Sequence, residues 1–154
     1  MKKAKVEFGV MEIRMEVRIA APRRRVWRAL VRETGRWWIE GFVAQKSSTR
    51  FVLEPRVGGR AYESGPGGQG LLWWTVTGLE TDRRLQMAGD LTPSYGGPAR
   101  LYEDFVLEDD GEDTLLKFTE TAHGSLGKGL EKSLRDGWAT LLLKGLKPYA
   151  ESRR

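Results

Sequence analysis

The chain ends in an apolar stripe with helical spacing, which follows a long run of strand-like segments. The stripe predicts one long amphipathic helix after Gly129. A helix with so wide an apolar face must bury it, and the predicted strands offer the largest partner surface. The stripe consists of Leu130, Leu134, Trp138, Leu141, Leu142, Leu146 and Tyr149.

Strand signals begin near the N-terminus and fill the middle of the chain. Between residues 11 and 19, apolar residues alternate strictly with Glu and Arg, which is the period of a half-buried strand. Further short segments are rich in β-branched and aromatic residues and are bounded by Gly, Pro and Asp. They are residues 51–54, 60–64, 71–79, 83–89, 99–108 and 114–123.

Two helical pieces separate the first strand from the others. In APRRRVWRALVR the apolar Val26, Trp27 and Leu30 share one helical face, and the arginines lie mostly on the other. RWWI, residues 36–39, follows as a second short helical or irregular piece. This order predicts an α+β fold in which a curved antiparallel sheet of about seven strands wraps around the C-terminal helix, in a single domain over residues 1–154.

Composition excludes several classes of site. The chain has no Cys, so it has no disulfide, thiolate nucleophile or Cys-based zinc site. Because His123 is the only His, we expect no metal, and no GxSxG, HExxH or Walker sequence is present. We expect no cofactor.

The charge pattern bears on partners and location. The net charge is +5, and the arginines of residues 23–32 surround an apolar stripe, which favours a solvated helix face over a nucleic-acid site. The start of the chain, MKKAKVEFGVMEIRMEV, lacks the unbroken apolar stretch of a secretory leader, and no segment is apolar enough to insert in a membrane. We therefore expect a cytoplasmic protein, monomeric or homodimeric. Asn is absent as well as Cys, which motivates the hypothesis of heat adaptation.

Three glycine-containing stretches are predicted to be turns. EPRVGGRAYE, residues 54–63, separates two strand segments. GPGGQG, residues 65–70, has the spacing of a dinucleotide-binding loop, but the next residues are strand-like, which favours a hairpin loop. EDDGED is a third turn, with Asp110 and Gly111 at its centre.

Aromatic residues are the main positive indication of a binding function. Most of these rings are expected in the core, but a sheet curled over one helix can leave an apolar cavity for a small ligand. Trp73 and Trp74 are adjacent in one strand, so they are predicted to point to opposite faces.

Four motifs, in order, resemble those of the START-like or SRPBCC superfamily, and within it the branch named after activators of the heat-shock ATPase. They are IAAPRRRVWRALV, FVLEPRVGGRAYE, WWTVTGLETDRRL and DGWATLLLKGLKPY, and the likeness extends from Ile19 to Tyr149. The resemblance implies the helix-grip fold and a cavity between the sheet and the last helix, near Trp138 and Leu142. The superfamily includes lipid and polyketide binders, cyclases, dehydratases and cochaperones.

We therefore expect a protein that binds a small hydrophobic or aromatic molecule in its cavity. One alternative is a polyketide cyclase-like or dehydratase-like enzyme with Glu103 and Glu120 as catalytic carboxylates, and another is a cochaperone that activates a chaperone ATPase. The ligand-binding candidates are Trp38, Tyr62, Trp74, Met87, Phe105, Phe118, Trp138 and Leu142.

The two candidate carboxylates follow from strand register. If Asp110 and Gly111 form a two-residue turn, Glu103 and Glu120 share the apolar face and lie diagonal to each other. A slip of two residues sets them directly opposite.

Either register brings two carboxylates together in an apolar setting. Both cannot easily stay ionised there, so at least one should have a raised pKa and act as a general acid or base, or bind a cationic group. In the alternative interpretation, both lie at the rim, or Arg60 or Arg84 neutralises them.

Overall fold

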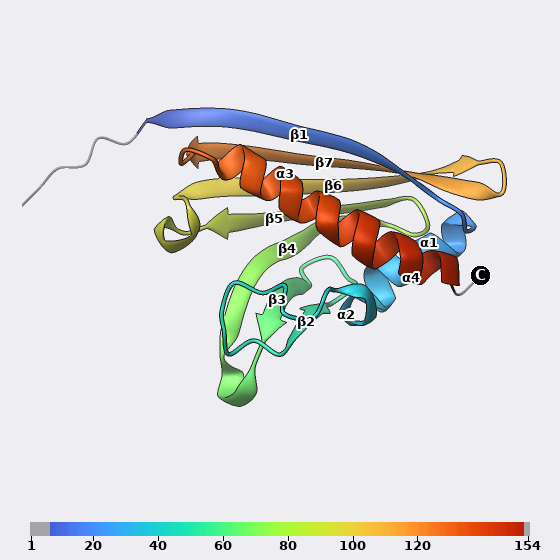
Figure 1. The fold of residues 1–154 in the computed structure, drawn as a ribbon, viewed down its shortest axis with the longest axis horizontal. Helices are drawn as coiled ribbons and strands as arrows, with labels where there is room; N and C mark the ends of the chain where they lie inside the picture. The colour runs from blue at the N-terminus through green and yellow to red at the C-terminus, as the bar shows by residue number, and fades with distance from the viewer. Residues whose placement is uncertain (1–6, 153–154) are drawn as a thin grey trace, which may run out of the picture.

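A seven-stranded antiparallel sheet and a long C-terminal helix form most of the computed structural model, which describes residues 7–152 (Figure 1). The strand order is β1-β7-β6-β5-β4-β3-β2, so β1 and β2 are the edges. The predicted α+β helix-grip fold is confirmed. The strands are β1 Phe8–Ile19, β2 Arg50–Leu53, β3 Arg60–Ser64, β4 Gly70–Glu80, β5 Arg84–Leu91, β6 Ala99–Asp110 and β7 Asp113–Ser125.

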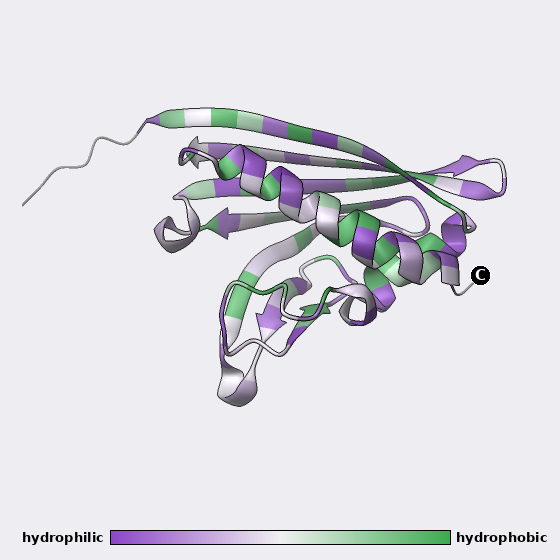
Figure 2. Cartoon of the chain, viewed as in Figure 1, coloured by the Kyte–Doolittle hydropathy of each residue, from purple (hydrophilic) through white to green (hydrophobic). Residues whose placement is uncertain are grey.

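Alternating side chains give the sheet one face for the core. Along β7 every second residue from Thr114 to Ala122 is buried, and Figure 2 shows hydrophobic and hydrophilic residues alternating along β1. The buried residues of β6 and β7 face the C-terminal helix, as Phe105 and Phe118 show by their contacts with the Trp138 ring, at centroid distances of 5.6 and 4.6 Å.

The two predicted helices follow β1. They are α1 Arg23–Arg32 and α2 Thr34–Trp37, so α1 ends before Gly35, which lies inside α2. The indole Nε1 of Trp37 donates a hydrogen bond to the Ala29 carbonyl at 2.7 Å, which fixes the angle between the two helices. Trp38 directly follows α2 and begins the long loop to β2.

The C-terminal helix has three parts: α3 Leu130–Thr140, a π-helical segment Leu141–Leu146, and α4 Lys147–Ser152. Another segment approaches this helix closely at Gly145, where an added Cβ would lie 2.7 Å from the Trp37 carbonyl oxygen. At Gly137 the nearest atom to an added Cβ is Phe42 Cζ, at 3.6 Å, so this position has room.

All three glycine-containing stretches form reversals between strands. Residues 54–59 join β2 to β3, and the 3₁₀ turn Pro66–Gly68 joins β3 to β4. Between β6 and β7, Asp110 pairs with Asp113, so the turn residues are Gly111 and Glu112 rather than Asp110 and Gly111. Gly111 has φ +63°, and the first position of a tight hairpin turn favours glycine for that reason.

The described residues do not include the two ends of the predicted domain, residues 1–6 and 153–154. Residues 1–6 also belong to the segment whose sequence argues against a secretory leader. Within residues 7–152, no helix combines the length and the apolar character that crossing a membrane requires.

Candidate functional site

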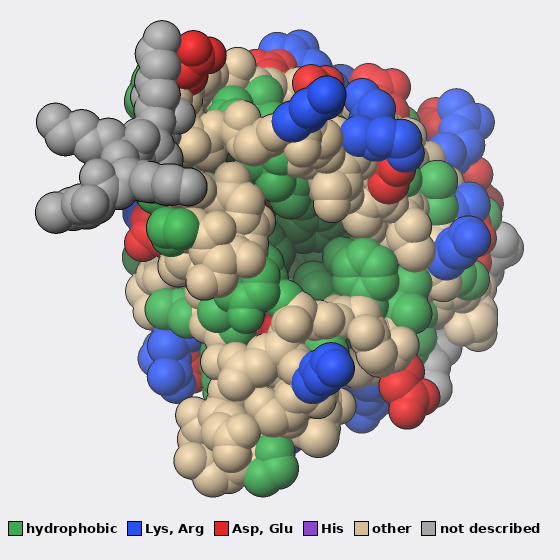
Figure 3. Space-filling model, turned by 60° about the vertical axis from the view of Figure 1, so that its left-hand side comes forward, with side chains coloured by type: hydrophobic (Ala, Val, Ile, Leu, Met, Phe, Trp, Pro, Cys, Tyr) green, Lys and Arg blue, Asp and Glu red, His purple; other side chains and the backbone are tan. Residues whose placement is uncertain are grey.

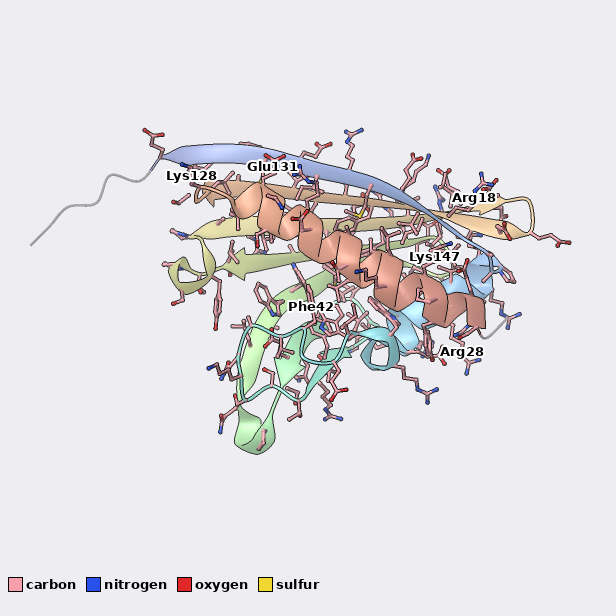
Figure 4. All side chains as sticks on the ribbon, viewed as in Figure 1. Arg18, Arg28, Phe42, Lys128, Glu131 and Lys147 are labelled. Carbon is pink, nitrogen blue, oxygen red and sulfur yellow. The ribbon has the colours of Figure 1, made fainter. Side chains whose placement is uncertain are left out.

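A pocket of about 360 Å³ lies between the C-terminal helix, the sheet and the loop that joins α2 to β2. Figure 3 shows a hollow with mostly hydrophobic walls on this face. Phe42, which Figure 4 labels, belongs to the loop and lies beneath the helix. The walls comprise Trp38, Gly41, Phe42, Val43, Ala44, Glu63, Trp73, Trp74, Leu101, Ser133, Leu134, Gly137, Trp138 and Leu141.

A β-bulge turns both adjacent tryptophans of β4 towards this pocket. Ala61 lies opposite Trp74 and Tyr62 lies opposite Leu72, so Trp73 is an extra residue without a partner on β3. The two indole centroids are 5.7 Å apart, and both rings line the pocket. The prediction of opposite faces was therefore wrong, because the bulge breaks the alternation at this point.

Glu63 on β3 holds the loop wall in place. Its carboxylate accepts hydrogen bonds from the backbone N–H of Ala44 at 2.8 Å and of Gln45 at 3.0 Å. It also accepts from Ser48 Oγ and Trp73 Nε1, both at 2.8 Å. One buried carboxylate thus connects the loop to the bulged strand. Glu63 was not among the predicted site residues, although its alternation with Ala61 along β3 is typical of a residue on the inner face of the sheet.

The two predicted carboxylates lie directly opposite each other on β6 and β7. The side chains of Glu103 and Glu120 are buried, with exposed fractions of 1% and 0%. Trp138 Nε1 donates a hydrogen bond to Glu120 Oε2 at 3.1 Å. Neither glutamate lines the pocket, because the indoles of Trp74 and Trp138 form the pocket wall on that side.

Neither of the two arginines proposed to neutralise the pair does so. Arg60 binds Glu54, at 2.9 Å between Nε and Oε1, and Arg84 binds Asp104, at 2.7 Å between Nη2 and Oδ2. That alternative was wrong, and so was placement at the rim. Burial, and then the neighbouring Glu120 carboxyl, raise the pKa of Glu103 well above its ordinary value of 4.5, while the Trp74 indole acts in the opposite direction. Burial beside a second carboxyl group therefore favours the protonated form of Glu103.

The predicted ligand-binding residues divide into three groups. Trp38, Trp74 and Trp138 line the pocket. Met87 and Phe105 line a void of about 20 Å³ deeper in the core, which the same three indoles also border.

The other three predicted residues do not border the pocket. Phe118 and Leu142 are packed in the hydrophobic core. Tyr62 lies under the Arg60 guanidinium, 5.0 Å from its ring centroid.

Several wall residues were absent from the prediction. Leu134, Gly137 and Leu141 share a helical face with Trp138, so helical spacing could have identified them. The loop residues 41–44 have no periodic pattern, and only their tertiary position brings them to the pocket. Among residues 7–152, no group of three or more His, Asp or Glu side chains is arranged to hold a metal ion.

Comparisons with known proteins agree with this architecture. The family model described as activator of Hsp90 ATPase homolog 1-like protein matches residues 20–151. No curated protein matches the chain.

Similar solved structures cover nearly the whole chain. A protein from Rhizobium leguminosarum has a TM-score of 0.72 at 18% identity, over 97% of this chain and 100% of its own. Ara h 8.0201 has a TM-score of 0.70 at 12% identity, over 94% of this chain and 100% of its own. CalU16 from Micromonospora echinospora has a TM-score of 0.64 at 18% identity, over 94% of this chain and 82% of its own. At these identities the likeness shows the fold alone.

Proposed function

The chain belongs to the family of activator of Hsp90 ATPase homolog 1-like proteins, a branch of the START-like superfamily, and we propose that it binds a small hydrophobic or aromatic molecule in the pocket beneath its C-terminal helix. The superfamily's fold supports ligand binding in this position.

The observation that carries the proposal is the composition of the pocket wall. Four tryptophans, Trp38, Trp73, Trp74 and Trp138, meet there with Phe42. A volume of about 360 Å³ is within the range of small-molecule sites. Hydrophobic walls with few polar groups favour an apolar ligand. The carboxyl pair does not line the pocket, so we propose binding rather than catalysis.

Gly137 offers a clean test of this function. Gly137→Leu places a side chain in the pocket, whereas Gly137→Ala adds one methyl group where there is room. We expect the fluorescent aromatic probe N-phenyl-1-naphthylamine to bind the wild type and the Ala variant saturably. The Leu variant should lose about tenfold or more in affinity, which corresponds to about 1.4 kcal/mol.

Fluorescence titration measures all three affinities, and circular dichroism checks that the variants are folded. Equal binding by a folded Leu variant would place the probe elsewhere and contradict the proposal.

A further inference from the structure

Buried polar groups without partners lie directly behind the pocket wall. Both carboxyl oxygens of Glu103, Oε1 of Glu120 and the indole Nε1 of Trp74 have no hydrogen-bond partner within residues 7–152. Proteins rarely bury polar atoms in this way, and each such case calls for a physical explanation. Here the groups cluster on β4, β6 and β7, at the side of the pocket where Trp74 and Trp138 form the wall.

Within residues 7–152, no salt bridge joins a cation to either glutamate of the carboxyl pair. Ile13 of β1 lies opposite Glu120, and Met87 of β5 lies opposite Glu103. The indoles of Trp74 and Trp138 also lie beside the pair. The other ionisable group at the pocket is Glu63, which is also acidic, and its two carboxylate oxygens already accept hydrogen bonds. Among the residues that the structure describes, the site therefore combines acidic groups without a paired cation.

The tryptophans add a second attraction for positive charge. The face of an indole ring attracts a cation, and cages of aromatic rings are a known way to bind organic ammonium groups. The rings of Trp73 and Trp74 are 5.7 Å apart, and those of Trp74 and Trp138 are 5.5 Å apart. These rings contact each other, so a ligand in the pocket would meet more than one indole at once.

The number of free acceptors indicates which cation fits. A primary ammonium group has three N–H donors, and the pair offers three unpartnered oxygens. Trp138 is held by its hydrogen bond to Glu120 at 3.1 Å, whereas the Trp74 N–H lies near enough to Glu103 to lower its pKa but makes no hydrogen bond of ordinary geometry. Trp74 is therefore the wall residue that can turn aside more easily.

We propose that the ligand of this pocket is an amine with an apolar or aromatic body, whose ammonium group reaches Glu103 and Glu120 when the Trp74 ring turns, while the tryptophans hold the body. This inference rests on the proposed function, because it names the chemistry of the ligand. As the ammonium binds, the proton held by the carboxyl pair is released to solvent.

The test compares tryptamine with tryptophol, which share the indole ring and differ in carrying an ammonium or a hydroxyl group. Isothermal titration calorimetry should show tryptamine binding at least tenfold more tightly to the wild type. Its affinity should increase from about pH 5 to about pH 8, because the carboxyl pair loses its proton as the amine binds. Titration in two buffers of different ionisation enthalpy measures the protons released.

The variants Glu103→Gln and Glu120→Gln should remove the preference for tryptamine and leave tryptophol binding unchanged. Glu108→Gln is the matched control, because it removes an exposed carboxylate from the same strand and should keep the preference. The buffer comparison on the wild type remains decisive if a Gln variant does not fold.

Three outcomes would overturn the inference. Equal affinity for tryptamine and tryptophol would show that the pocket binds apolar molecules without using the carboxyl pair, and the proposed function would stand. A tryptamine preference that persists in both folded Gln variants would place the cation elsewhere. If tryptamine, tryptophol and N-phenyl-1-naphthylamine all fail to bind, the proposed function is overturned together with the inference.

Discussion

At the scale of single residues, the environment of a side chain matters more than its type. Glu54 and Glu103 are both glutamates on or beside the sheet. The hydrogen bond from Arg60 lowers the pKa of the partly exposed Glu54 to about 2. Burial raises the pKa of Glu103, and the Glu120 carboxyl raises it further. The environment thus favours the ionised form of one glutamate and the protonated form of the other.

Glu103→Gln should change how stability depends on pH. The folded state holds the Glu103 proton more tightly than the unfolded state does, so this group's contribution is fully present below about pH 4.5 and is lost as pH rises through the folded pKa. The loss is at most about 1.4 kcal/mol per pH unit. The variant lacks this loss, so its stability relative to the wild type should increase as pH rises above about 4.5.

Urea unfolding at a series of pH values measures the difference. The pH-dependent contributions of other groups, such as Glu54, to stability are the same in both proteins and cancel in the difference. A difference that is constant with pH would contradict the buried, protonated state of Glu103.

The two glycines of the C-terminal helix should respond oppositely to alanine. Gly137→Ala should stabilise the protein by up to about 1 kcal/mol, because alanine is the better helix former and the added methyl has room. Gly145→Ala should destabilise it by about 1 to 3 kcal/mol, because the methyl would collide with the Trp37 backbone. Thermal unfolding of the two variants in parallel gives both signs, and an unchanged or increased stability of Gly145→Ala would refute the close packing at Gly145.

At the scale of elements, the pocket depends on irregularities in otherwise regular structure. The bulge at Trp73 adds a second indole to the wall. The loop between α2 and β2 has no repeating pattern of backbone hydrogen bonds. Instead, the carboxylate of Glu63 holds it by accepting hydrogen bonds from residues 44, 45 and 48. Local propensity alone would not hold this wall in position.

Glu63→Ala should release the loop wall while leaving the sheet folded. The change removes the acceptor for Ala44 and Gln45, and the lost hydrogen bonds are worth about 1 to 3 kcal/mol. Amide hydrogen exchange should therefore accelerate at these two residues by roughly 5-fold to 150-fold.

Ser48→Ala is the control, because it removes one hydrogen bond to the same carboxylate. It should affect these amides much less. Unchanged exchange at Ala44 and Gln45 in Glu63→Ala would show that the loop is held by other contacts.

At the scale of the whole molecule, the curved sheet and the C-terminal helix close one end of the core and leave the other open. Near α1 the core is closed by packing: Arg25 lies over the Tyr149 ring of α4, at 5.2 Å from its centroid, and pairs with Glu33. Under α3 the sheet and the helix are separated by the loop and the tryptophans, and the pocket occupies this space. The pocket is thus a property of the assembled layers.

The sequence by itself determined the elements and their order. The alternation in residues 11–19, the helical stripe after Gly129 and the glycine turns depend on local periodicity and backbone freedom, which are visible along the chain. It also predicted that Glu103 and Glu120 are neighbours, because either hairpin register keeps them on one face. Heat adaptation remains a prediction.

Only the tertiary structure decided the register, the two indoles on one face and the separation of the carboxyl pair from the pocket. The turn residues are shifted by one position from those predicted, which sets Glu103 directly opposite Glu120. The bulge at Trp73 arises in the pairing of β3 with β4, and the loop wall depends on Glu63, 18 or more residues away from Ala44 and Gln45. These features depend on contacts between segments distant in the chain, and periodicity within a single segment carries no information about them.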